Sequence, residues 1–355
     1  MNSIVEFLNT GGGRLWHFAG PMLLQSSLLI AAMFALDRLF RRKIRAAIRY
    51  AAWLIVLVKL LVPPTLAFPT GAAWWLRHSE SKPLALQSQT TVVVHYGPMI
   101  APPVFPKLQP ITPLKISLSA SGWVFLVWGI VSAGLFGWML SRWFQVKRAV
   151  RRATSPAENF YELLDETRRA CRLEKGVRLR WTENAMSPAV CGLFRPVILL
   201  PRALTEKLAT AQLRAVLLHE MIHLKRRDVW VNCAQALIQI VYWWHPLLWF
   251  ANARIRRVRE EAVDDAVMLA LRDDSETYAP TLLEVAKLAL NRPLASLGLV
   301  GILESRNALR QRIERLIHFP VPRKAGVSVI SLIGLAAFTA VALPMGQAPE
   351  KSGKP

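Results

Sequence analysis

Long apolar stretches recur along the chain and predict membrane helices. Leu15–Leu36, Ile116–Ser141 and Ala325–Leu343 carry no charged residue. At about 1.5 Å per helical residue, each can cross a bilayer core of about 30 Å. A fourth stretch, Ala46–Leu61, carries Lys59 near one end, where a lysine can extend its ammonium group to the membrane interface. We therefore expect four transmembrane helices.

A fifth apolar stretch, Val229–Phe250, is expected not to cross the bilayer. The polar residues Asn232, Gln235 and Gln239 interrupt it, and the pair His245-Pro246 breaks its far end. The aromatic residues of that end suit the membrane interface: Tyr242, Trp243, Trp244 and Trp249. We expect a helix over Val229–Trp244 that turns at Pro246, and a second helix over Leu247–Leu271 that returns antiparallel to it. The first helix would then lie against the inner face of the membrane.

Between the third and fourth spans, the pattern becomes that of a folded domain. Glu158–Leu173 has helical periodicity, residues 177–182 alternate apolar and polar positions, and Ala189–Pro201 predicts two short strands. A helix is expected from Thr210 to about Arg227. This helix carries an HExxH sequence at residues 219–223. A small sheet followed by an HExxH helix is the arrangement expected of a zinc-peptidase core, in which an edge strand can hold an extended substrate. Support for packing alone is the alternative role of the strands.

Charge fixes the expected orientation in the membrane. The 355 residues are 53% hydrophobic, yet the formal net charge is +22. Basic residues flank the predicted spans. They lie between the first and second spans (Arg38, Arg41, Arg42, Lys43, Arg45, Arg49), after the third (Arg142, Lys147, Arg148, Arg151, Arg152) and before the fourth (Arg323, Lys324). Because Lys and Arg accumulate on the cytoplasmic side, we expect these segments inside and both termini outside. Nucleic-acid binding is the competing interpretation, but clusters that flank spans do not form one binding stripe, so no direct nucleic-acid binding is expected.

The predicted fold class is an α-helical, multi-spanning membrane protein (four spans) with a cytoplasmic α+β zincin-like peptidase domain. The expected parts are two membrane helices (1–68), a proline-rich outer loop (69–115), a third membrane helix (116–141), the peptidase domain (142–324, with a membrane-apposed helix 229–244), a fourth membrane helix (325–343) and an outer tail (344–355). The loop is expected to be extended, with one β-like run, Thr90–Tyr96. Cys171, Cys191 and Cys233 have no CxxC spacing and are expected to be reduced.

The sequence His219-Glu220-Met221-Ile222-His223 lies within the helix predicted from Thr210. Histidines four residues apart share one helical face and can bind one Zn²⁺, while Glu220 between them can act as general base on an activated water. A chance match is the alternative until a third ligand is found. Tyr278 and His245 are available to stabilise an oxyanion, but a structural role is expected for both.

The best candidate for the third ligand is Glu261. On a helix, Asp265 lies one turn further along the same face and can accept a hydrogen bond from a ligating histidine. Glu260 and Asp264 are competing candidates in the same acidic cluster. For any one of these acids, a solvated pairing with the neighbouring arginines is the alternative.

Several motifs occur in the order and spacing of one known family. They are Ser187-Pro188-Ala189-Val190, Gly192-Leu193-Phe194-Arg195-Pro196, Leu199-Leu200-Pro201, the segment His219–Asp228 with Asn232, Trp243-Trp244-His245-Pro246, Glu261–Ala266, and Lys59-Leu60-Leu61-Val62-Pro63. From about residue 15 to residue 345, the chain resembles the BlaR/MecR-type integral-membrane zinc metallopeptidases, which are antirepressor signal transducers. The resemblance implies one Zn²⁺ held by His219, His223 and Glu261, with Glu220 as general base and Asp265 as support for a ligand.

The resemblance also implies a place in the bacterial cytoplasmic membrane and limited proteolysis of a cytoplasmic, DNA-binding repressor after an external signal. Self-cleavage would fall in Leu299–His318, which also has the pattern of an ordinary amphipathic helix. Antibiotic-sensing members carry a penicillin-binding domain after the fourth span, and this sequence ends at Pro355. We therefore do not expect this chain alone to sense β-lactams, and a separate sensor protein or the outer loop would receive the signal. Family members often have Cys where this chain has Asp264.

Two other functions remain open at this stage. A housekeeping membrane zinc protease would use the same chemistry on a broader range of substrates. A non-catalytic membrane sensor or scaffold would keep the zinc for structure, although a structural site has no need of the base Glu220.

Overall fold

The computed structural model describes residues 2–66, 68, 70, 117–174, 176–183, 187–290, 306–318 and 327–345. The β-like run Thr90–Tyr96, nearly all of the loop expected between Pro69 and Lys115, the tail beyond residue 345 and residues 299–305 lie outside these ranges. Within them, the chain is mostly helical and has one small sheet.

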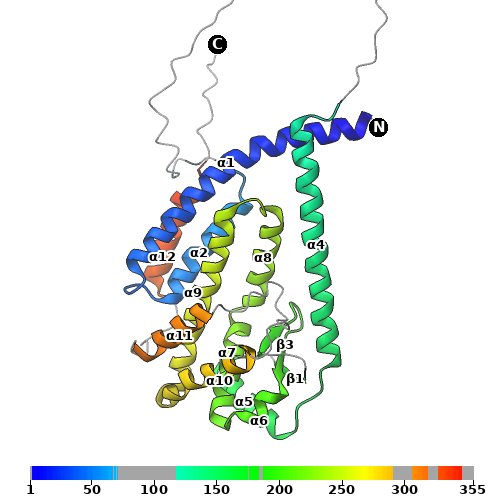
Figure 1. Ribbon diagram of the computed structural model, residues 1–355. Coiled ribbons are helices and arrows are strands. Elements are labelled where there is room, and N and C mark those ends of the chain that lie inside the picture. Colours follow the sequence, from blue (N-terminus) through cyan, green and yellow to red (C-terminus); the bar gives the residue numbers. More distant parts are fainter. Residues whose placement is uncertain are drawn as a thin grey trace, which may run out of the picture.

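The helices form an upper and a lower region joined by two helices that extend through both (Figure 1). The upper region contains α1 (Asn2–Phe40), α2 (Ala46–Leu61), α12 (Val329–Ala342) and most of α4 (Ala120–Arg152). The lower region contains α5 (Asn159–Ala170), α6 (Arg202–Lys207), α7 (Thr210–Lys225), η1 (Arg272–Thr277), α10 (Tyr278–Leu290) and α11 (Arg306–His318). The joining pair is α8 (Asp228–Val241) and α9 (Pro246–Leu271).

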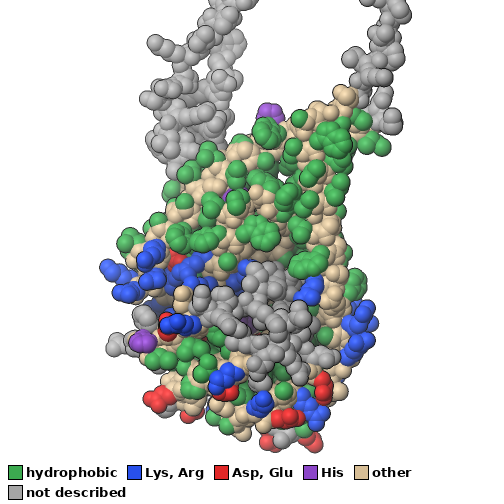
Figure 2. Space-filling view, in the orientation of Figure 1, with side chains coloured by type: hydrophobic (Ala, Val, Ile, Leu, Met, Phe, Trp, Pro, Cys, Tyr) green, Lys and Arg blue, Asp and Glu red, His purple; other side chains and the backbone are tan. Residues whose placement is uncertain are grey.

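Two of the described helices, α1 and α4, are long and apolar enough to cross a membrane. Both are longer than the stretches predicted from the sequence, α2 has the predicted bounds, and the apolar helix α12 is shorter than predicted. In Figure 2, hydrophobic side chains cover the upper region and lysines and arginines gather below them. Large apolar side chains exposed on α4 and α12, such as Trp123 and Ile330, are typical of a surface that faces lipid.

Lys59 joins the end of α2 to the end of α12. Its side chain is fully buried within the protein, and its ammonium group donates to the Leu343 carbonyl at 2.9 Å. The last carbonyls of a helix lack partners within the helix and carry a partial negative charge. Lys59 therefore caps the end of α12. Gln25 of α1 strengthens the same junction by donating to the Met345 carbonyl at 2.9 Å.

The α8–α9 pair is a helical hairpin held together by the polar residues that interrupt its apolar sequence. Gln235 donates to Asn252 at 2.9 Å, and Asn252 donates to Gln239 at 2.6 Å. Asn232 accepts a hydrogen bond from Arg259. These contacts place α9 beside α8, so that the chain after Pro246 runs back toward the lower region (Figure 1).

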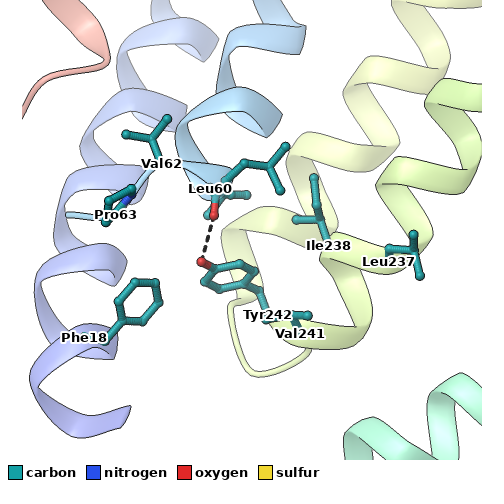
Figure 3. Close-up of a pocket in the computed structure, with 9 residues that line it drawn as sticks. Phe18, Leu60, Val62, Pro63, Leu237, Ile238, Val241 and Tyr242 are labelled. Atoms are coloured by element: carbon teal, nitrogen blue, oxygen red, sulfur yellow. Dashed lines mark hydrogen bonds between the residues drawn. The ribbon is translucent and has the colours of Figure 1, made fainter. Parts of the chain in front are cut away.

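The tip of the hairpin inserts between α1, α2 and α4. Tyr242 donates to the Leu60 carbonyl of α2 at 2.8 Å, beside an apolar cavity of about 330 Å³ that Phe18 of α1 also lines (Figure 3). Trp128 of α4 donates to the Val241 carbonyl at 2.9 Å. The sequence predicts that this segment lies against the inner face of the membrane, and in the structure the C-terminal end of α8 and the following turn contact α1, α2 and α4.

The sheet contains β1 (Arg178–Thr182), β2 (Ala189–Cys191) and β3 (Val197–Pro201) in the order β1-β3-β2. β1 is parallel and β2 antiparallel to the central β3, which is buried at every position. Gly192 opens the β2–β3 turn with φ of +90°, and a Cβ there would lie 2.8 Å from the Arg195 carbonyl oxygen.

Helix α7 is the centre of the lower core. Leu217 and Met221 on α7 pack with Val263 and Val267 on α9, and all four side chains have no exposed surface. The sheet and α5 belong to the same core. This packing fixes the face of α7 that α9 contacts and so determines which acidic side chains of α9 reach the two histidines. The three cysteines are free.

Candidate metal centre

His219 and His223 come from successive turns of α7 and direct their ring nitrogens to one point. Their Nε2 atoms lie 3.1 Å apart, and both side chains are mostly buried. The spacing of four residues places them on the same helical face, as the sequence predicts. The helix needs no special backbone at this point, because both residues lie well inside α7.

The acidic residue that meets the two histidines is Glu260 of α9. Its Oε2 atom lies 3.6 Å from Nε2 of His219 and 3.6 Å from Nε2 of His223. A tetrahedral zinc ion with ligands at about 2.0–2.2 Å has ligand atoms about 3.3–3.6 Å from one another. The three donor atoms therefore have nearly the separations of one face of such a tetrahedron, which leaves a fourth position free.

Each histidine is oriented by a hydrogen bond at its other nitrogen. Nδ1 of His223 lies 2.7 Å from Oδ2 of Asp228, at the start of α8. Nδ1 of His219 lies 2.8 Å from the Tyr278 hydroxyl, which donates in turn to Asp264 at 2.7 Å. The Tyr278 hydroxyl therefore accepts from His219, and both Nδ1 atoms carry hydrogen. With both Nδ1 atoms engaged, the two Nε2 atoms beside Glu260 are the ones left to bind a metal ion once they have lost any proton.

The electrostatics of the cluster also favour the binding of a metal ion. Burial acts to lower the pKa of His223, but the Glu260 charge and the hydrogen bond to Asp228 outweigh it and raise that pKa to about 9. Burial acts to raise the pKa of Glu260, but His223 and the hydrogen bonds from the histidines hold it well below its usual value. The cluster therefore attracts positive charge and keeps its carboxylate ionised, as a metal ligand must be.

Glu220 lies between the two histidines in sequence and is 7% exposed. Burial raises its pKa, and the charge of Glu260 acts in the same direction. A carboxylate whose proton affinity is raised by burial is suited to accept a proton in a reaction. The role of Glu220 as general base stays a prediction from the sequence.

The structure places Glu261 and Asp265 away from the histidines. The Glu261 carboxylate lies 2.8 Å from Nη1 of Arg49 and 3.5 Å from Arg257, and Asp265 pairs with Arg315. Adjacent helical residues point about 100° apart, so a helix that directs Glu260 at the metal cannot also direct Glu261 there. The sequence analysis had the correct acidic cluster, but the histidines meet its alternative member, Glu260.

Asp264, the second competing candidate, supports a ligand without meeting the metal position. It receives the Tyr278 hydrogen bond and two from Arg312 of α11, at 2.8 and 2.9 Å. Nη1 of Arg312 also lies 3.6 Å from the Glu260 carboxylate. Sequence reasoning assigned no role to Arg312 or Asp228. Asp228 had a usable signal, because it lies five residues after His223 and begins the next helix.

His245 and Tyr278 are both structural in their contacts. His245 has no exposed surface, and its Nε2 atom lies 2.8 Å from the Ser26 hydroxyl of α1, at the tip of the hairpin. Tyr278 uses its hydroxyl between His219 and Asp264. These contacts agree with the structural role that the sequence favours for both residues.

Two helices of membrane length, an HExxH helix and a partly buried glutamate facing its histidines indicate a membrane-associated protein of the metallopeptidase class. The chain belongs to the BlaR1 peptidase M56 family, whose family model matches residues 17–316. It is 29% identical over 134 residues to the regulatory protein BlaR1 of Bacillus licheniformis, which covers 38% of this chain and 22% of the relative. It is 21% identical over 272 residues to the methicillin resistance mecR1 protein of Staphylococcus aureus, which covers 74% of this chain and 45% of the relative. The chain thus spans less than half the length of these curated relatives.

Proposed function

We propose that this protein is a membrane-embedded zinc metalloendopeptidase that cleaves a cytoplasmic protein in signal transduction. The observation that supports the proposal most directly is the convergence of His219, His223 and Glu260, whose donor atoms all lie within 4.8 Å of one another. Histidine nitrogens and a carboxylate oxygen are the donors of open catalytic zinc sites. We assign the third ligand to Glu260 and the support of the histidines to Asp228 and Tyr278.

The proposed mechanism uses Glu220 as the proton carrier. When bound, zinc would lower the pKa of a water molecule and polarise the carbonyl of the scissile peptide bond. Glu220 takes the proton of the attacking water and passes it to the leaving amine. Strand β2 is an edge of the sheet beside α7, so its outer side is available for main-chain hydrogen bonds to an extended substrate.

The substrate we propose is a transcriptional repressor. The support is the resemblance to BlaR1, a regulatory protein by name, together with the basic segments, whose charge favours a location of the peptidase region inside the cell. A housekeeping protease would show a broad set of substrates, and a scaffold would show none.

Comparison of newly formed protein N-termini in cells tests this function. The cells express either the wild-type chain or the double variant His219→Ala/His223→Ala at equal membrane levels. We expect new termini in one or a few cytoplasmic proteins, including a DNA-binding repressor, with the wild-type chain only. Identical termini in both strains would refute the peptidase, and termini in many unrelated proteins would favour the housekeeping alternative.

We further propose four membrane spans, α1, α2, α4 and α12, with the α8–α9 hairpin entering the membrane from the inside without crossing it. In a chain with its three cysteines replaced, a single cysteine at Ser3 is expected to react with a membrane-impermeant maleimide in intact cells. A single cysteine at Lys43, in the basic α1–α2 loop, is expected to react only after the cells are opened. The reverse labelling pattern would mean that the topology is opposite to the one proposed.

A further inference from the structure

A buried ion cluster joins the first two helices of the chain to the helix that carries Glu260. Arg49, in the first turn of α2, lies 2.5 Å from Asp37 at the end of α1 and 2.8 Å from Glu261 of α9. The second oxygen of Asp37 lies 2.6 Å from Arg254, also on α9. Asp37, Arg49 and Glu261 are each less than 10% exposed. Buried ion pairs hold strongly when every member is satisfied, because removing one leaves an uncompensated charge.

The position of Glu261 gives this cluster control over the metal site. Glu261 follows Glu260 directly, and the two side chains point about 100° apart around α9. When Arg49 holds Glu261, it therefore fixes the rotation of α9 at the turn where Glu260 faces His219 and His223.

The next residue of α2 reaches the other side of the site. The Tyr50 hydroxyl donates to Oδ1 of Asp228 at 3.3 Å, while Oδ2 of the same carboxylate accepts from His223. The Tyr50 ring is 7% exposed and lies under the guanidinium group of Arg226, 4.8 Å from the ring centre. Two consecutive residues of one apolar helix thus support a histidine ligand on α7 and the glutamate ligand on α9.

Building on the proposed function, we propose that the first turns of α2 position the metal ligands and that Arg49 and Tyr50 are positioning residues of the peptidase site. A shift of α2 relative to α9 would turn Glu260 relative to the histidines. The membrane helices would thereby control the geometry of the zinc site without touching the substrate.

Metal binding to the full-length protein in detergent tests the inference. The variants are Arg49→Met, Arg49→Lys and Tyr50→Phe, and the matched control is Lys59→Met, which also removes a buried cation from α2 but about 15 Å further along the helix. The readouts are zinc affinity, measured by competition with a chromophoric chelator, and the visible spectrum of bound Co²⁺, which reports the arrangement of the ligands. Thermal unfolding checks that each variant is folded.

Arg49→Met is expected to weaken zinc binding about 10–100-fold, the range found when partners of metal ligands are removed, and to change the Co²⁺ spectrum. Arg49→Lys should recover part of both, Tyr50→Phe should show a smaller change, and Lys59→Met should match the wild type. If Arg49→Met does not fold, Glu261→Gln replaces it, because it keeps the shape of the side chain and removes only its charge.

A folded Arg49→Met or Glu261→Gln protein with wild-type zinc affinity and an unchanged Co²⁺ spectrum would overturn the inference while leaving the proposed function intact. Absence of zinc and cobalt binding in the wild type would instead overturn the proposed function itself. An equal loss in Lys59→Met would also overturn the inference, because the effect would then reflect any buried charge in α2.

Discussion

Replacing Glu260 by alanine is expected to release zinc from the purified protein and to abolish cleavage. The change removes one of the three donor atoms and leaves two histidines, which cannot complete a catalytic zinc site. The loss of affinity should exceed the roughly 10–100-fold expected for the partners of ligands. Zinc content after dialysis, measured by atomic absorption against protein concentration, gives the result directly.

The matched control is Glu284→Ala, which removes an exposed glutamate paired with Lys287 on α10 and should leave zinc at about one per chain. Glu261→Ala is the informative comparison, because the sequence favoured Glu261 as the ligand. We expect it to weaken zinc binding less than Glu260→Ala does. A larger loss of zinc affinity in Glu261→Ala than in Glu260→Ala would identify Glu261 as the third ligand.

Replacing Glu220 by glutamine is expected to keep zinc at about one per chain and to slow cleavage by about 10²–10⁴-fold. Glutamine fills the same buried space but cannot accept the proton of the attacking water. Cleavage rates and zinc content measured on the same preparation separate this effect from loss of the metal. Glu314→Gln, which neutralises an exposed glutamate of α11, should leave both unchanged. Wild-type cleavage by Glu220→Gln would remove Glu220 from the mechanism.

Local patterns were sufficient to predict parts of the fold. The sequence placed α2 at its observed bounds and both histidines on one face of α7, because hydropathy and the spacing of HExxH are properties of a single segment. The polar interruptions Gln235 and Gln239 predict a helix that does not cross the bilayer, and in the structure both side chains contact Asn252 of α9. The short strands followed from alternation and flanking turns in the same way.

The parts of the fold and of the site that could not be predicted depend on contacts between distant segments. Glu260 and Glu261 are equivalent in sequence, and only the rotation of α9 against α7 selects between them. The packing of Val263 and Val267 against α7 holds that rotation, and in our proposal so does Arg49, more than two hundred residues earlier in the chain. Lys59 likewise has the pattern of a residue at a membrane interface, and its partner is a carbonyl of the last helix. No periodicity within one segment encodes such pairings.

The cap that Lys59 places on α12 has a consequence for the order of synthesis. Its partner, the Leu343 carbonyl, is made 284 residues later. At about 5–20 residues per second, roughly 15–60 s pass before that carbonyl exists. During this interval the ammonium group of the nascent α2 has no Leu343 carbonyl to meet, and a charge within an apolar environment is costly. Lys59 therefore gains the partner seen in the structure only after the Leu343 carbonyl has been made.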